Sequence, residues 1–168
     1  MKRRQKSVKR DKCVQNFETA KSAVILFDTM LPGCFQHVKD LSKFLTSKNI
    51  KTKAYGLVAQ KETPQEMLLW ANIEFITKKD RLWYGAPSGD ATNDYFNQVP
   101  DLLFVINFKE SLTLDYLVSL SRARFKVGCF TDQENDLDLM INPAKKECEA
   151  GFFIEQVKHY ISLLNPSN

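Results

Sequence analysis

The chain contains little glycine and little proline, six of each among 168 residues. That scarcity excludes collagen-like and low-complexity proteins, which are rich in both. Long apolar runs are also missing, since none approaches the ~18–20 residues that a transmembrane helix needs. What is present is ordinary globular usage, with 43% hydrophobic and 26% charged residues. A chain of this length buries enough surface to fold as one domain without a disulfide or a metal.

Cysteine is sparse and the histidines are few, which argues against a metal centre. No CxxC pair occurs, and zinc-site spacing is absent among Cys13, Cys34, Cys129, Cys148, His37 and His159. The basic start of the chain is not followed by the apolar stretch of a signal peptide. We therefore expect reduced thiols, no metal and a cytoplasmic protein without a transmembrane segment.

The common motifs of cofactor binding and catalysis are missing too. The sequence has no GxGxxG, no GxxxxGK[ST] and no GxSxG. The alternating acids from Asp132 to Asp138 lack a calcium loop's glycine at position six, which is Leu137, and its glutamate at position twelve, which is Pro143. We expect no cofactor, and the balance favours a protein that is not an enzyme.

Positive charge gathers at the N-terminus. Residues 1–21 hold eight Lys/Arg and two Asp/Glu, a net charge of +6, whereas the remaining residues hold 16 and 18, a net charge of −2. We interpret residues 1–21 as a basic arm or a weakly docked helix. Its candidate contacts to RNA or another acidic partner are Lys2, Arg3, Arg4, Lys6, Lys9 and Arg10. The alternative is that the arm only keeps the protein soluble.

Short apolar segments alternate with amphipathic ones along the rest of the chain. The strands predicted are 22–27, 51–59, 73–77, 101–107, 125–130 and 137–141. The helices predicted are 35–45, 90–98, 111–120 and 153–164. Residues 63–70 fit either a short helix or an apolar linker.

This alternation predicts an α/β fold, because repeated strand–helix units cover both faces of a parallel sheet. Right-handed crossovers then favour a single three-layer Rossmann-like domain over residues 22–165, followed by a tail at 166–168. The predicted sheet is mostly parallel with strand order 3-2-1-4-5, and 137–141 is a candidate edge strand.

Ligands of such sheets bind beyond the carboxyl ends of the strands, where the strand order reverses. The residues that this rule selects here are Asp28, Thr29, Asn107, Lys109 and Ser111. The competing interpretation is that they only close turns and cap helices, which these residue types do in most α/β proteins. The sequence favours that second interpretation, with Asp28 and Asn107 as the better candidates for function.

Two other features allow a functional and a structural interpretation. Cys34 is predicted near a helix start, which lowers a thiol pKa, but no base accompanies it and a buried thiol is favoured. Trp83 and Tyr84 could stack on a base or a sugar, but such pairs more commonly anchor a loop on the core.

Several stretches of the chain resemble a known family. Residues 21–28, 75–87, 120–128, 137–141 and 153–157 are similar to an uncharacterised family of small Bacteroidota proteins, known only as a domain of unknown function. This resemblance implies no activity, cofactor or catalytic residue. Residues 101–128 are also similar to the N-terminal half of heptosyltransferase-type glycosyltransferases, whose nucleotide-sugar domain this chain has no room for.

Two functional hypotheses follow from these observations. The first is a non-catalytic binding or interaction module whose basic arm meets an acidic partner. The second is a small enzyme or ligand binder that holds a phosphorylated or sugar-like ligand between the strand ends. In the second, Lys109 offsets anionic charge, Asp28 accepts from hydroxyl groups, and Ser111 with the following amides contacts phosphate.

Overall fold

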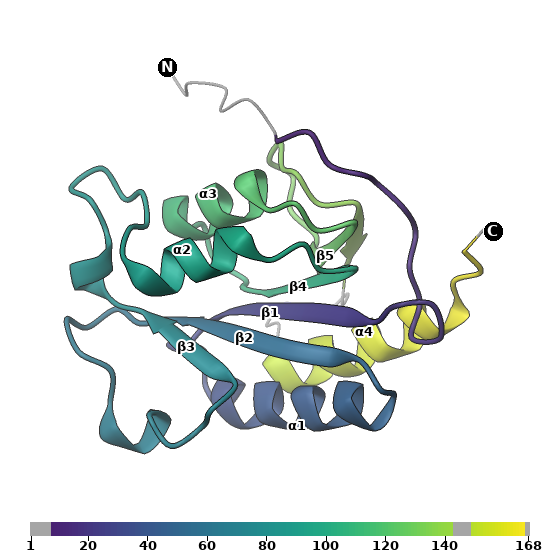
Figure 1. The fold of residues 1–168 in the computed structure, drawn as a ribbon, viewed down its shortest axis with the longest axis horizontal. Helices are drawn as coiled ribbons and strands as arrows, with labels where there is room; N and C mark the ends of the chain where they lie inside the picture. The colour runs from purple at the N-terminus through teal and green to yellow at the C-terminus, as the bar shows by residue number, and fades with distance from the viewer. Residues whose placement is uncertain (1–7, 143–148, 167–168) are drawn as a thin grey trace.

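A computed structural model describes residues 8–142 and 149–166. Within these ranges no helix combines the length and the apolar character that crossing a bilayer requires. The chain forms a six-stranded sheet between two layers of helices (Figure 1). The fold class predicted from the sequence is thereby confirmed.

The sheet has the strand order β3-β2-β1-β4-β5-β6, and every neighbouring pair is parallel. The segment predicted at 137–141 forms the edge strand beside β5. The strands are β1 (Ser22–Asp28), β2 (Lys51–Leu57), β3 (Ile73–Ile76), β4 (Leu102–Ile106), β5 (Phe125–Cys129) and β6 (Leu139–Ile141). The order reverses between β1 and β4, which places the expected binding edge at their carboxyl ends.

Helices cover both faces of this sheet. Figure 1 shows α1 (Cys34–Ser47) and α4 (Ala150–Leu163) on one face, and α2 (Asp90–Asn97) and α3 (Leu112–Leu120) on the other. The connection from β2 to β3 contains only a short 3-10 helix, η1 (Gln65–Met67). A second one, η2 (Lys78–Asp80), follows β3.

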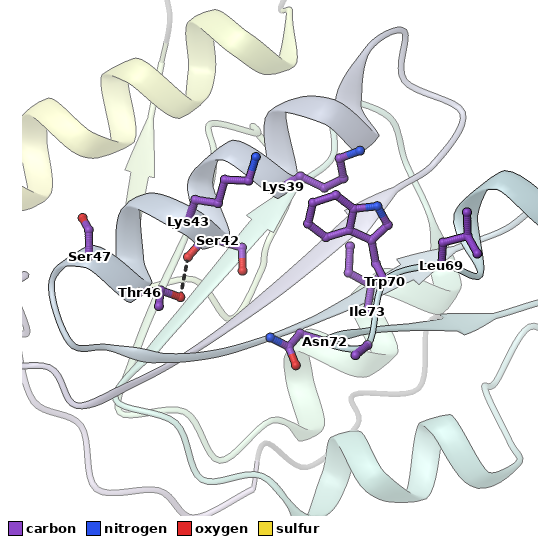
Figure 2. A pocket seen from close by; sticks show the side chains of 10 residues that line it. Lys39, Ser42, Lys43, Thr46, Ser47, Leu69, Trp70, Asn72 and Ile73 are labelled. Carbon is purple, nitrogen blue, oxygen red and sulfur yellow. Dashed lines mark hydrogen bonds between the residues drawn. The ribbon is translucent and has the colours of Figure 1, made fainter.

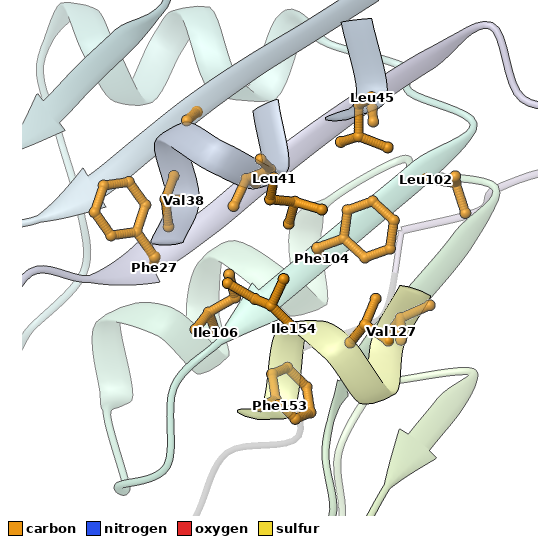
Figure 3. Close-up of a cluster of buried hydrophobic side chains, with 14 of the residues drawn as sticks. Phe27, Val38, Leu41, Leu45, Leu102, Phe104, Ile106, Val127, Phe153 and Ile154 are labelled. Atoms are coloured by element: carbon orange, nitrogen blue, oxygen red, sulfur yellow. The ribbon is translucent and has the colours of Figure 1, made fainter. Parts of the chain in front are cut away.

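The core is divided by the sheet into two hydrophobic clusters. Because successive side chains of a strand point to opposite faces, alternate residues of each central strand enter different clusters. Phe27 and Phe104 pack under α1 and α4 (Figure 3), whereas Leu26 and Leu103 pack under α2 and α3. Burial on both faces explains why β1 and β4 read as continuous apolar runs.

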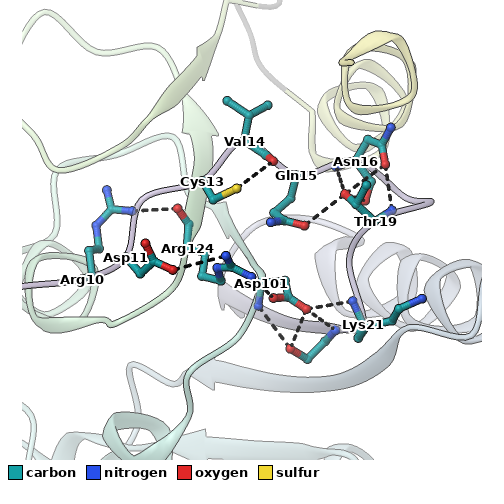
Figure 4. Close-up of polar contacts among 11 residues, drawn as sticks. Arg10, Asp11, Cys13, Val14, Gln15, Asn16, Thr19, Lys21, Asp101 and Arg124 are labelled. Carbon is teal, nitrogen blue, oxygen red and sulfur yellow. Dashed lines mark hydrogen bonds and ion pairs between the residues drawn. The ribbon is translucent and has the colours of Figure 1, made fainter. Parts of the chain in front are cut away.

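The segment before β1 lies against the body over much of its length (Figures 1 and 4). Phe17 and Ala20 belong to the core cluster under α1 and α4. The Asn16 side-chain amide donates to the Leu164 carbonyl at 3.0 Å, and so ties the segment to the end of α4. The folded unit therefore includes residues before Ser22, the expected start of the domain.

Arg10 departs furthest from the expectation of a solvated arm. Its side chain is only 6% exposed, and its guanidinium pairs with Asp138 at 2.6 Å. The same guanidinium donates to the carbonyls of Ala123 at 2.9 Å and Arg124 at 3.1 Å. Its two terminal nitrogens thus bond within the protein, as a buried guanidinium requires if it is not to destabilise the fold.

Candidate functional site

A crevice of about 190 Å³ opens at the carboxyl ends of β1 and β4. It is lined by Asp28, Met30, Leu57, Ala59, Arg81, Asn107, Lys109, Glu110 and Ser111. The structure thus brings together four of the five residues that the strand-end rule selected. Thr29 is the exception, since it does not line the crevice and its hydroxyl donates to the Leu57 carbonyl at 2.9 Å.

Three of these four polar side chains also hold the local backbone. Asp28 accepts from the Met30 N–H at 2.9 Å, which closes the turn after β1. The Asn107 side chain bonds both backbone groups of Lys109, its oxygen accepting from the N–H at 3.4 Å and its amide donating to the carbonyl. The Ser111 hydroxyl accepts from the Leu114 N–H at 3.3 Å and caps α3. The turn-and-cap interpretation therefore describes their contacts within the chain.

The cap leaves part of the helix terminus available to a ligand. Since the Ser111 hydroxyl satisfies Leu114, the backbone N–H groups of Leu112 and Thr113 have no partner within α3. Donors of this kind at a helix N-terminus favour a bound anion. They lie beside the crevice, because Ser111 itself lines it.

Arg81 lines the crevice but was not among the residues predicted for it from the sequence. It follows η2, and its guanidinium donates to the carbonyls of Val58 and Ile76, the latter at 3.5 Å. Its Nε is buried and has no hydrogen-bond partner in the described part of the chain. Burial lowers the pKa of Arg81, and the nearby charges of Asp28 and Asp80 partly offset that shift.

Arg81 could have been found by the rule that found the other residues. The carboxyl end of β3 lies at the same edge of the sheet as those of β1 and β4. Applying the rule to this outer strand as well would have included the residues that follow Ile76.

The crevice mixes two cations with two carboxylates. Lys109 is exposed, and no carboxylate partners its amine among residues 8–142 and 149–166. Glu110, by contrast, accepts a hydrogen bond from the Gln133 side chain. Lys109 therefore supplies the less balanced positive charge, because Asp28 and Asp80 partly balance that of Arg81. The Asp28 carboxylate still has capacity to accept from hydroxyl groups.

Among the described residues, neither an activated thiol nor a metal centre lies at this edge. Cys34, the first residue of α1, is buried, and burial together with the charge of Asp28 raises its thiol pKa to about 12. A thiol with that pKa stays protonated at neutral pH. Because only the thiolate is reactive, Cys34 is not an activated nucleophile. No group of three or more His, Cys, Asp or Glu side chains in the described ranges is placed to hold a metal ion.

Trp83 and Tyr84 do not anchor their loop on the core, so that interpretation is wrong. Trp83 is 95% exposed and Tyr84 is 55% exposed. They lie between Arg81 and Pro87, which form an isolated antiparallel bridge. The loop is instead fixed by its backbone, because the Thr113 hydroxyl donates to the Gly85 carbonyl at 2.8 Å.

The residues proposed for an acidic partner are only partly visible. Lys2, Arg3, Arg4 and Lys6 lie outside the described residues. Lys9 is exposed, whereas Arg10 is committed to the internal contacts given above. Lys12 is 70% exposed and lies 3.7 Å from Asp138. The described part of the arm therefore presents Lys9, Lys12 and Lys21 to solvent.

Comparison with known proteins identifies a family but no function. A family of unknown function, DUF6913, matches residues 1–164. No curated protein and no solved structure matches the chain. The likeness to heptosyltransferase-type enzymes accordingly gains no support, and the Bacteroidota origin stays a prediction.

Proposed function

The chain belongs to this family of unknown function, and we propose that it binds a small phosphorylated or sugar-like ligand in the crevice between β1 and β4. The observation that carries the proposal is that two incompletely partnered cations, Arg81 and Lys109, line the same crevice beside the start of α3. An anion there offsets the cost of leaving the Nε of the partly buried Arg81 without a partner.

Each lining group has a distinct role in this proposal. The Lys109 amine and the backbone N–H groups of Leu112 and Thr113 contact the phosphate oxygens. Arg81 supplies positive charge from the wall of the crevice. Asp28 repels a second phosphate and accepts from ligand hydroxyls, which favours a ligand with one anionic end and one hydroxylated end.

The size of the crevice limits the ligand. At about 190 Å³ it is smaller than the ~300–1,000 Å³ of sites that enclose drug-sized ligands. It accommodates a phosphate with a few attached atoms rather than an enclosed dinucleotide. Because no activated nucleophile lines it among the described residues, we assign binding rather than catalysis to this crevice.

A thermal-shift screen tests the proposal, with inorganic phosphate, glucose 6-phosphate and glucose as probes. A binder at 100 times its dissociation constant adds about 2.7 kcal/mol of stability. The matched variants are Lys109→Gln and Lys78→Gln, since both lysines are exposed and only Lys109 lines the crevice. We expect glucose 6-phosphate to stabilise the wild type and the Lys78 variant, and to bind about tenfold more weakly to the Lys109 variant.

Two results would contradict this assignment. One is that no probe raises the melting temperature of the wild type. The other is that the Lys109 and Lys78 variants respond equally, which would move binding away from the crevice.

The basic N-terminus supports a second candidate, an interaction with RNA or another acidic partner. Its basis is the net charge of +6 over residues 1–21, with Lys9 and Lys12 exposed. Its test replaces Lys2, Arg3, Arg4, Lys6 and Lys9 by Gln and keeps Arg10, which the fold uses. We expect the affinity for single-stranded RNA, measured by fluorescence anisotropy, to fall with salt at a log–log slope of about −0.7 per neutralised phosphate. Equal, weak binding by both proteins would leave the arm as a solubility feature.

A further inference from the structure

The layer of helices that contains α1 and α4 is incomplete beside β3. In a right-handed parallel sheet, the connection from β2 to β3 crosses on the same face as α1. Here residues 58–72 make that connection with only η1, a single short turn. No helix of the chain's described part therefore covers β3 on this face.

A groove of about 680 Å³ lies beside α1 at this place (Figure 2). One wall is a stripe of α1 with helical spacing, formed by Lys39, Ser42, Lys43, Thr46 and Ser47. The other wall is the end of the β2–β3 connection, formed by Leu69, Trp70, Ala71, Asn72 and Ile73. The groove is distant in the fold from the crevice, because Ile73 begins β3 whereas the crevice lies at the carboxyl ends of the strands.

The groove combines apolar surface with positive charge. Leu69 is 86% exposed and the neighbouring Leu68 is 61% exposed, so the lip of the groove is apolar and uncovered. Trp70 packs against the core below, and the Lys39 amine lies 4.2 Å from the centre of its ring. The Lys43 amine lies 5.7 Å from the same ring.

These two lysines lack a close carboxylate. The described residues that line the groove include Lys39 and Lys43 and no acid. The contact of Lys43 with Asp40 is 4.0 Å long and both side chains are more than half exposed, so it neutralises little of the charge. An occupant that supplies carboxylates would therefore complement the groove.

We propose that this groove docks an acidic amphipathic α-helix of a partner protein, which takes the place of the missing crossover helix. Its apolar face covers Leu69, Trp70 and Ile73, and its carboxylates pair with Lys39 and Lys43. The narrow side chains of Ser42 and Thr46 let a helix approach α1 at the usual ~8–10 Å between axes.

Two other occupants fit the charge less well. The chain's own N-terminus carries a net charge of +6 over residues 1–21, so the two lysines repel it. In a two-fold dimer of this chain the grooves of the two copies would face each other, and their lysines would repel.

The test uses two designed 18-residue helical peptides with the same leucine face and with either Glu or Lys on the polar face. The protein is the full chain with Trp83→Phe, which leaves Trp70 as its only tryptophan, since the sequence contains two. We expect the Glu peptide to bind, seen as peptide anisotropy and as a blue shift of Trp70 emission, and the Lys peptide to bind at least tenfold more weakly.

Matched variants locate the contact. The double variant Lys39→Glu/Lys43→Glu should weaken the Glu peptide at least tenfold. The control Lys48→Glu/Lys51→Glu changes the net charge equally at exposed positions outside the groove and should bind nearly as the parent does. Leu69→Asp, at a side chain too exposed to affect folding, should also abolish the Trp70 shift.

Each of the remaining outcomes would overturn the proposal. These are the absence of binding by both peptides, equal binding of both peptides, and equal loss in the groove and control variants. A concentration-dependent dimer in sedimentation that Leu69→Asp dissociates would instead identify a second copy as the occupant. None of these results bears on the crevice, because the peptides and variants do not touch it.

Discussion

The buried Lys126 makes the pH dependence of stability a sharp test of the structure. It lies in β5 and is only 1% exposed, and its amine donates to the Val118 carbonyl near the end of α3. Burial, with a smaller contribution from the charge of Arg10, lowers its pKa from 10.5 to about 8, against the opposing charges of Asp136 and Asp138. At neutral pH the protein therefore holds a charged amine in its interior.

The sign of the effect follows from proton binding. Because the folded pKa lies below the unfolded one, the unfolded state binds more protons between pH 8 and 10.5, so stability rises with pH there. At 1.36 kcal/mol per pKa unit the whole rise is about 3 kcal/mol. Below about pH 7 the amine is protonated in both states, and this lysine contributes no further change.

Lys126→Met removes the titrating group and keeps the apolar stem. We expect this variant to be more stable than the wild type at pH 7 and the difference to shrink by about 2–3 kcal/mol between pH 8 and 10. The thiol of Cys34 and the hydroxyls of Tyr55 and Tyr95 also titrate differently on unfolding, but they are common to both proteins.

Urea unfolding at several pH values between 7 and 10 measures this difference. Lys61→Met, at an exposed lysine that makes no contact with Lys126 or with the charges around it, is the surface control and should follow the wild type throughout. Parallel curves for the wild type and the Lys126 variant would refute the reasoning, because they would show that Lys126 is not charged in a buried place.

Further predictions concern the fold. Ile106→Asp places an unpaired charge in a strand covered on both faces and should abolish cooperative unfolding by circular dichroism, so near-wild-type stability would contradict its place in β4. Deleting residues 1–9 should leave the melting temperature unchanged. Deleting residues 1–20 should lower the free energy of unfolding by at least ~2–3 kcal/mol, because it removes the buried Phe17. Equal melting temperatures for the two deletion variants would instead support a domain that begins at Ser22. Gly56→Ala should cost about 1–3 kcal/mol in urea unfolding, since the new Cβ would lie 2.9 Å from two phenylalanine rings, and an unchanged midpoint would refute that close contact.

The sheet could be predicted from the sequence because its signals are local. The apolar runs of β1 and β4 and the helical spacing of α1 each lie within one short window. The right-handed crossovers of such sheets then leave few possible strand orders, of which the Rossmann-like one was chosen. The strand-end rule selected five residues, and four of them line the crevice.

The N-terminal segment could not be predicted in this way. The partners of Arg10 are Ala123, Arg124 and Asp138, more than a hundred residues away, and charge counting along the chain does not detect them. The same limit applies to the groove beside α1, because it exists only where a helix fails to form between β2 and β3. The prediction for Trp83 was wrong because it relied on the general tendency of aromatic side chains to pack on the core, whereas Trp83 is 95% exposed.

The most direct test of the crevice is an NMR titration of the ¹⁵N-labelled full chain with glucose 6-phosphate. The proposed function predicts that the largest amide shifts fall at residues 109–113, around the start of α3, with the Arg81 side chain responding as well. The same titration of Lys109→Gln should need about tenfold more ligand to reach equal shifts. Shifts centred on the groove residues 69–73 or on the N-terminal segment, or none at all, would contradict the proposed function.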